Sequence, residues 1–204
     1  MTGSRNALAT VASVSLIVGL ARPVEAVVTC SLPTPDKTIR QLFPESTGHR
    51  LQIKRMKMSG GIELRDKIAH ALGRPLDQAG EYDVMYPVYE VLVEDKLISR
   101  IMCSTERGQG HKCQIAVAIS TQGKLQKLFF DSLLYPPPEV FHSPEYTARF
   151  QGLGLLDFKE QGQAEAIEAP PGGTPFDNQA IKQGVHKLLL LHEAWFRSQP
   201  RRGK

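Results

Sequence analysis

The sequence predicts an α+β fold, in which an antiparallel sheet of consecutive strands carries flanking helices and a C-terminal helix packs on the sheet. Three observations lead to it. Runs of alternating apolar and polar side chains, typical of half-buried strands, follow one another between residues 87 and 135. Short turns separate most of these runs, which favours pairing between neighbours in the chain. Near the C-terminus, apolar residues recur at helical spacing instead.

Residues 1–26 have the layout of a secretory signal peptide. An early Arg5 precedes an apolar run of 15 residues from Ala7 to Ala21, and the small residues Val24 and Ala26 suit a cleavage site. The run is shorter than the roughly 20 residues that a spanning helix needs. We therefore expect cleavage after Ala26 and a periplasmic or otherwise exported protein without a transmembrane span. The alternative is an uncleaved segment that anchors the protein to the membrane.

The mature chain would be nearly neutral. Removing residues 1–26 leaves 23 Lys+Arg against 20 Asp+Glu, a net charge of +3. No basic stripe appears, and residues 198–204 are interpreted as a basic tail, so nucleic acid is not an expected partner. The remaining length, about 178 residues, suffices for one domain with a core of its own.

The elements follow in order along the mature chain. Residues 27–59, with prolines at 33, 35 and 44, are expected to be irregular, and residues 62–73 to form a short helix that Gly73 ends. Residues 27–85 are thus interpreted as an N-terminal extension with one short helix. The expected strands are "PVYEVLV" (87–93), "LISRIMC" (97–103), "CQIAVAIS" (113–120) and "LQKLFFDSLLY" (125–135).

Two helices are expected after the sheet. The stretch "SPEYTARFQG" has Ser143 as N-cap, Pro144 at the first helical position and Gly152 as the stop. A loop over 160–173 then leads to the last helix, expected from about Asn178 to Phe196.

The cysteines suggest either a disulfide or buried thiols. A hairpin centred on Gly108 would place Cys103 opposite Cys113, with both side chains toward the core and within bridging reach. A Cys103–Cys113 disulfide and two buried free thiols are then about equally favoured. No fourth ligand completes a zinc site with these cysteines and His111, and no CxxCH haem motif is present.

The stretch "PPGGTPFDNQAIKQGV" (170–185) contains the parts of a phosphate site. Gly172, Gly173 and Thr174 precede a helix whose N-terminal amides, at Asn178, carry the positive end of the helix dipole. The simpler interpretation is that Asp177 caps the helix and the glycines only turn the chain.

From residue 86 to residue 197 the chain resembles the FMN-binding domain of exported flavoproteins, found in the Rnf complex and the sodium-pumping NADH:quinone oxidoreductase. "YEVLVEDKLISRIM", "GHKCQIAVAISTQGKLQKLFF", "LLYPPPEVFHSPEYTARFQG" and "GGTPFDNQAIKQGVHKLLLL" stand in the order of that family's conserved segments. The resemblance implies an electron-transfer protein, rather than an enzyme with its own substrate, whose partners are membrane-associated or exported redox proteins.

The resemblance also implies a site for FMN. Gly172, Gly173, Thr174 and the amides at Asn178 would hold the phosphate, Lys112 would add positive charge, and Tyr135 would contact the ring.

In flavinylated members a threonine carries the flavin, and a gapless alignment puts Pro175 at that position, so FMN would be bound without a covalent link. Asp177 adds an opposing charge. The alternative is a cofactor-less accessory subunit that kept the fold and binds a redox partner. A hydrolase is disfavoured because no GxSxG motif is present.

Overall fold

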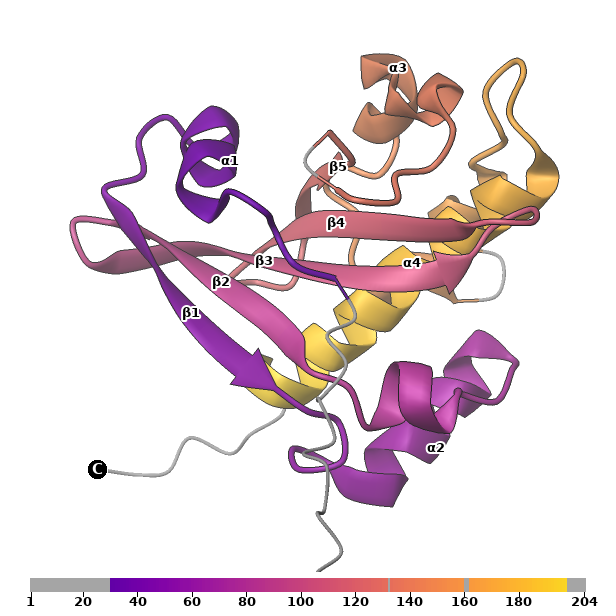
Figure 1. The fold of residues 1–204 in the computed structure, drawn as a ribbon, viewed down its shortest axis with the longest axis horizontal. Coiled ribbons are helices and arrows are strands. Elements are labelled where there is room, and N and C mark those ends of the chain that lie inside the picture. The colour runs from indigo at the N-terminus through magenta and orange to yellow at the C-terminus, as the bar shows by residue number, and fades with distance from the viewer. Residues whose placement is uncertain (1–29, 132, 160–161, 198–204) are drawn as a thin grey trace, which may run out of the picture.

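The structure is a computed structural model that describes residues 30–131, 133–159 and 162–197 (Figure 1). The expected signal peptide and basic tail lie outside these residues. The sheet is antiparallel throughout, with the strands in sequence order. Its strands are β1 (Gly48–Lys54), β2 (Tyr86–Val93), β3 (Lys96–Arg107), β4 (Lys112–Ser120) and β5 (Leu125–Phe129). The helices are α1 (Pro35–Leu42), α2 (Gly61–Leu72), α3 (Pro144–Ala148) and α4 (Pro175–His192). The predicted α+β class is confirmed.

The sheet lies between two layers (Figure 1). Helix α4 runs diagonally across one face, and α1 with the segment before it lies on the other. Helix α4 packs tightly on the sheet at Gly184, where an added Cβ would stand 2.8 Å from Ile115 Cδ1 and 3.0 Å from Glu106 Cγ. Glu106 and Ile115 therefore face α4. Because side chains alternate along a strand, Ile101 and Cys103 of β3 face the opposite layer.

The turns between the predicted strands use positive backbone φ angles. Glu94 and Asp95 both have positive φ, 46° and 63°, as a two-residue type I′ hairpin turn requires. Gly123 has φ 79° in the turn between β4 and β5. Gly73 ends α2 in the left-handed conformation, and Ser143 caps α3 through a bond from the Tyr146 amide, both as predicted.

The prediction that residues 27–59 are irregular was wrong. They include α1 and β1, and β1 pairs with β2 from Gly48↔Leu92 to Lys54↔Tyr86. The strand was missed because it lies at the sheet edge and its apolar side chains face outward, with Leu51 54% and Ile53 50% exposed. Strand β1, from the expected 27–85 extension, thus belongs to the same sheet as the strands of the 86–197 domain.

The predicted register of the central hairpin was also wrong. The turn is the four-residue loop 108–111, closed by the pair Arg107↔Lys112 and a bond from Gly108 N to His111 O of 2.9 Å. The register is shifted by three residues, so Cys103 pairs with Ala116 and Cys113 with Glu106. An odd shift places the two thiols on opposite faces of the sheet. The predicted Cys103–Cys113 disulfide is therefore absent, and all three cysteines are free thiols.

The strand predicted over 125–135 ends earlier, at Phe129. Further along, Leu134 and Tyr135 run beside β4, because both backbone amides donate to the Oε1 of Gln114, at 3.0 and 3.1 Å. In the part of the chain that the structure describes, no helix combines the length and the apolar character needed to cross a membrane.

Candidate functional site

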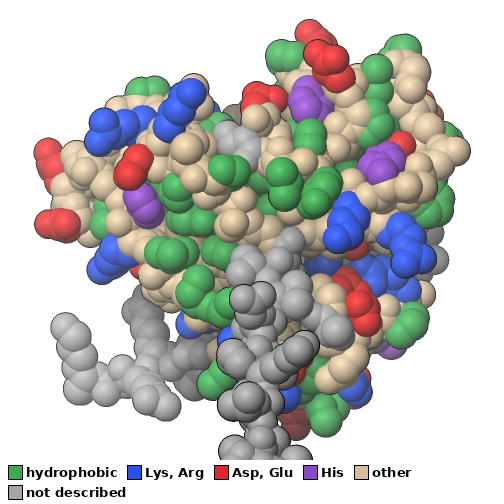
Figure 2. Space-filling model, in the orientation of Figure 1, with side chains coloured by type: hydrophobic (Ala, Val, Ile, Leu, Met, Phe, Trp, Pro, Cys, Tyr) green, Lys and Arg blue, Asp and Glu red, His purple; other side chains and the backbone are tan. Residues whose placement is uncertain are grey.

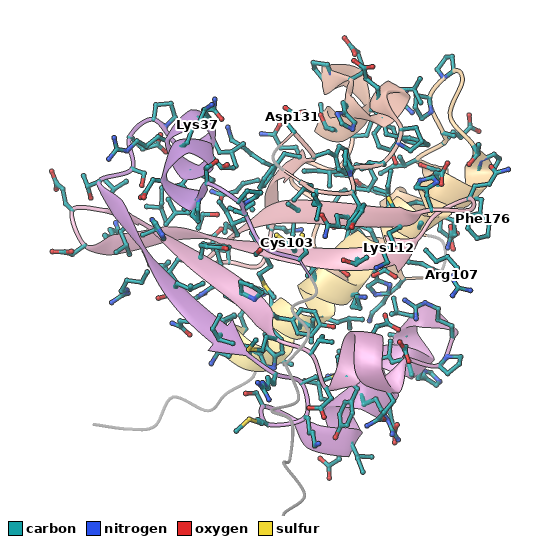
Figure 3. The ribbon with its side chains drawn as sticks, viewed as in Figure 1. Lys37, Cys103, Arg107, Lys112, Asp131 and Phe176 are labelled. Carbon is teal, nitrogen blue, oxygen red and sulfur yellow. The ribbon has the colours of Figure 1, made fainter. Side chains whose placement is uncertain are left out.

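Three loops meet at the end of the sheet where β3 turns into β4. Figure 3 shows Arg107, Lys112 and Phe176 there, beside the start of α4. The Lys112 Nζ lies 5.6 Å from the centre of the Tyr135 ring, and Val140 is the side chain closest to Gly172. We call the exposed residues of these loops, Lys112, Tyr135, Val140 and Phe176, the loop face. The fold thus brings most of the predicted site residues to one end of the molecule.

Helix α4 begins three residues earlier than predicted. Thr174 is its N-cap and Pro175 its first residue, so Asp177 lies inside the first turn instead of capping it. The Thr174 Oγ1 accepts from the Asp177 amide at 3.0 Å and donates to the Asp177 Oδ2 at 2.8 Å. This reciprocal pair is a variant of the capping box, in which the acid accepts from the N-cap hydroxyl. The hydroxyl expected to bind phosphate is therefore already bonded to a carboxylate.

Asp177 also holds the β3–β4 turn against α4. Its Oδ1 accepts from the Gln109 amide at 2.7 Å and lies 3.5 Å from the His111 Nε2. The side chain is only 2% exposed. A buried carboxylate with two hydrogen bonds, placed at the positive end of a helix dipole, supplies the negative charge that a bound phosphate would otherwise bring.

Asn178 is part of the core and does not form the surface of an anion site. Its amide donates to the Thr174 carbonyl at 3.1 Å, as an ordinary helical bond. Its side-chain Oδ1 accepts from the Tyr146 hydroxyl at 2.7 Å, and its Nδ2 donates to the Ile167 carbonyl at 2.8 Å. Asn178 therefore joins α4 to α3 and to the loop before α4, and it is only 5% exposed.

The two glycines of the loop have different roles. Gly172 has φ 82°, which favours glycine, and it leaves room for the Val140 side chain at 3.5 Å from an added Cβ. Gly173 is confined: an added Cβ would stand 2.7 Å from the Phe141 ring, and its amide donates to the Pro170 carbonyl at 2.8 Å. Both glycines are thus explained by the path of the chain.

Lys112 and Tyr135 are the predicted site residues that remain available to a ligand. Lys112 begins β4 and is exposed, and the Tyr135 ring is 46% exposed. The Tyr135 backbone is held by Gln114, whose amide donates to the Tyr135 carbonyl at 2.7 Å. Nearby, Phe176 is 53% and Val140 37% exposed. The loop face therefore presents aromatic and aliphatic surface beside a cation.

The structure contains a buried charge cluster that the sequence did not predict. It consists of Arg74 after α2, Glu81 in the π-helical turn Gln78–Tyr82, Glu106 of β3 and Lys187 of α4. The Lys187 Nζ bonds to Glu81 at 2.8 Å and also pairs with Glu106. Arg74 bonds to Glu81 at 2.8 Å and to Glu106 at 2.7 Å. Two cations and two anions are thus fully matched.

Ion pairing within the cluster stabilises the charged forms of Glu81 and Lys187. Burial by itself would raise the pKa of Glu81, but hydrogen bonds and charge from Arg74 and Lys187 lower it to about 2. Burial likewise opposes the charge on Lys187, yet the two glutamates raise its pKa above the ordinary value. The only sequence signal was a lysine inside the apolar run "HKLLLLH". With its partners saturated, the cluster joins α2, β3 and α4 and does not offer a reactive group.

A groove of about 750 Å³ lies between α1 and the segment after β5. Lys37 and Asp131, labelled in Figure 3, lie on it, and Leu134, which is 70% exposed, forms part of its wall. Figure 2 shows hydrophobic side chains at the surface of this part of the molecule. None of the predicted site residues lines the groove, so it is a feature separate from the α4 N-terminus.

The described residues contain no group of three or more His, Cys, Asp or Glu side chains that could hold a metal ion. The arrangement as a whole is that of an α+β meander domain with a closed helix N-terminus and an exposed loop face. No protein-family model matches the chain, and no curated protein matches it significantly.

Proposed function

We propose that this protein is an exported binding module that works without a flavin of its own and docks on a redox protein through its loop face. The class of protein is inferred from the resemblance to FMN-binding domains, and the proposed protein is a form of that fold without the cofactor. One observation carries the choice. The Asp177 carboxylate occupies the α4 N-terminus and accepts a hydrogen bond from the Thr174 hydroxyl at 2.8 Å.

A flavin phosphate at this position would have to displace or approach that carboxylate. Two negative charges near 4 Å apart repel by about 4 kcal/mol at an effective dielectric constant of 20. The Asn178 amide is used inside the helix, and Pro175 has none. The Asp177 amide is bonded to the Thr174 hydroxyl, so none of these three positions offers a phosphate a free donor, and the Asp177 carboxylate opposes its charge.

The loop face has the composition of a docking surface. Aromatic residues supply most binding energy at protein interfaces, and Tyr135 and Phe176 are both about half exposed. Lys112 and Arg107 lie beside them, and Figure 2 shows Lys and Arg side chains gathered on this side of the molecule. This charge favours a partner with an acidic, partly apolar patch, as complementary charge steers association.

The first experiment measures flavin binding. The mature chain, from residue 27, is titrated with FMN while the flavin fluorescence and the visible spectrum are recorded. The cofactor-less proposal expects a colourless protein and no quenching at micromolar FMN. A yellow protein, or saturable quenching, would contradict it.

The second experiment addresses the partner. A photo-crosslinking amino acid replaces Phe176 in the exporting host, and crosslinked proteins are identified by mass spectrometry. We expect a flavin, haem or iron–sulfur protein, with the crosslink lost when Lys112→Glu and Arg107→Glu are combined. The control places the same probe at Glu94 and the charge reversal at Lys96, at the far end of β3, about 36 Å away at 3.3 Å per residue. Equal crosslinking from both ends would argue against a loop-face partner.

The second candidate function is an electron-transfer protein that binds FMN non-covalently. It is supported by the convergence of Gly172, Gly173, Thr174, Lys112 and Tyr135 at one end of the sheet. Under this proposal Asp177→Asn would tighten FMN binding and Lys112→Ala would weaken it, each by about tenfold for a charge contact near 1.4 kcal/mol. Denaturation should release the flavin even after expression with a flavin transferase. Flavin that stays with the polypeptide, and is lost in Thr174→Ala, would show a covalent link instead.

A further inference from the structure

Two cysteines that are far apart in the sequence lie on the same side of the sheet, one in the N-terminal segment and one in β3. Cys30 precedes α1, and Cys103 lies in the middle of β3, on the face opposite α4 (Figure 3). Both side chains belong to one buried cluster, and the interaction with Cys30 is the main cause of the raised pKa of the Cys103 thiol. Cys30 is 3% exposed and Cys103 is fully buried. The third cysteine, Cys113, lies on the other face and pairs in register with Glu106.

The backbone on both sides of this thiol pair is held in place. The Leu32 amide donates to the Tyr89 hydroxyl at 3.2 Å, and Leu32 is 3% exposed. Tyr89 pairs with Ile101 across the β2–β3 ladder, so it stands on the same face as Cys103 and one side chain away. The hydrogen bond at Leu32 and the sheet register therefore bring the backbone two residues after Cys30 to the face of the sheet that carries Cys103.

We propose that Cys30 and Cys103 form a disulfide when the chain folds in an oxidising environment, and that this bond ties the N-terminal segment to the centre of the sheet. The reaction is thiol–disulfide exchange with a disulfide oxidant, such as glutathione disulfide or a dithiol oxidase. One thiolate attacks the oxidant, and the second displaces it from the mixed disulfide. The two cysteines lose two electrons and two protons, and the oxidant is reduced to two thiols.

The bond should form during folding and not afterwards. The interaction with Cys30 and burial together raise the pKa of the Cys103 thiol well above its ordinary value. Because the thiolate is the attacking species, both thiols are unreactive once buried. The same burial shields a completed disulfide from reductants in the folded protein.

The disulfide would close a loop of more than 70 residues, from Cys30 to Cys103. Cross-links over loops of this size restrict the unfolded chain strongly, which for a domain of about 175 residues corresponds to a rise in Tm on the order of 10 °C. The bond would leave Cys113 as the one free thiol.

The test starts from full-length chain that is reduced, unfolded and refolded in a mixture of glutathione and glutathione disulfide. The product is denatured without reductant and its thiols are alkylated. We expect labelling of Cys113 alone. In a tryptic digest, the peptide "IMCSTER" (101–107) should be linked to the peptide that ends at Lys37 and contains Cys30. Labelling of all three cysteines would overturn the proposal, as would a digest in which Cys103 is linked to Cys113.

Three cysteine variants test the effect of the bond on thermal stability. Tm is measured with and without reductant in the refolding buffer, so that each variant serves as its own reference. The wild type and Cys113→Ala should lose about 10 °C when refolded with reductant. Cys30→Ala and Cys103→Ala should show the same Tm under both conditions. A reductant-dependent Tm in either of the last two variants would contradict a Cys30–Cys103 bond.

Discussion

At the scale of single residues, the fold depends on polar side chains that are buried only because they find partners. Asp177, Asn178, Glu106 and Lys187 are each less than 7% exposed, and each has hydrogen bonds or ion pairs. Burying such groups without partners would cost several kcal/mol apiece. They therefore specify how α4 is placed on the sheet, more sharply than apolar contacts do.

Lys187→Met should be strongly destabilising, although methionine suits an apolar helix face. The change leaves Glu81 and Glu106 with Arg74 as their remaining cation, and breaking a buried ion pair from one side typically costs about 3–5 kcal/mol. Urea denaturation followed by circular dichroism measures this loss. Lys182→Met, on the exposed side of the same helix, is the matched control and should change stability by less than about 0.5 kcal/mol. Adding Glu106→Gln should recover part of the loss, and no recovery would mean that charge imbalance is not its cause.

At the scale of elements, the β2–β3 turn has a backbone conformation that its two residues do not favour. Glu94 and Asp95 both adopt positive φ, where residues with a Cβ are strained. The double substitution Glu94→Asn with Asp95→Gly supplies the residues that a type I′ turn prefers, and it should stabilise the protein by about 1 kcal/mol. The amide of residue 94 keeps its bond to the Thr47 hydroxyl because only side chains change. Thermal unfolding measures the gain. Asp95→Val should instead destabilise the turn, and a neutral result for both variants would exclude strain there.

Helix α4 also makes stability depend on pH. Burial lowers the pKa of His186 to about 4, and burial with the nearby charges of Arg100 and Arg197 lowers that of His192 to about 4. Both values lie below the unfolded value near 6.5, so the unfolded chain binds more protons as the pH falls. Stability is therefore complete above pH 6.5 and is lost as pH falls toward 4.

The contribution of His192 to this loss should be about 3 kcal/mol, because its side chain is 1% exposed and its Nε2 lacks a hydrogen-bond partner among the described residues. His192→Leu should flatten the dependence of the unfolding free energy on pH between 6.5 and 4. Urea titrations at several pH values measure this. A variant whose pH profile matches the wild type would assign the loss to other groups.

At the scale of the whole molecule, the expected export would place the cysteines in an oxidising compartment, where a disulfide can form. We predict cleavage after Ala26, because an apolar run of 15 residues precedes the small residues at positions 24 and 26. N-terminal sequencing of protein from an exporting host should begin at Val27. Ala26→Arg should block this cleavage, whereas Glu25→Gln should not. Protein that begins at Met1 in the wild type would exclude a cleaved signal peptide and leave the uncleaved anchor as the alternative.

The sequence by itself determined the elements that local chemistry specifies. Side-chain alternation or backbone preference within a few residues specifies the four strands from residue 87 onward, the glycine turn at 123, the Gly73 stop and the Ser143 cap. The resemblance predicted a flavin site made of Lys112, Tyr135 and the glycine loop, and this site stays a prediction; the structure shows only that Lys112 lies 5.6 Å from the Tyr135 ring centre.

The tertiary structure alone decided the features that join distant segments. Strand β1 is held by pairing with β2, because its exposed side chains carry no pattern of burial. A shift of three residues in one hairpin separated Cys103 from Cys113 and brought it against Cys30. The Asp177 carboxylate is held by the Gln109 amide of the β3–β4 turn, 68 residues earlier in the chain. Each outcome depends on register or on a contact across many residues, and local propensity contains no information about either.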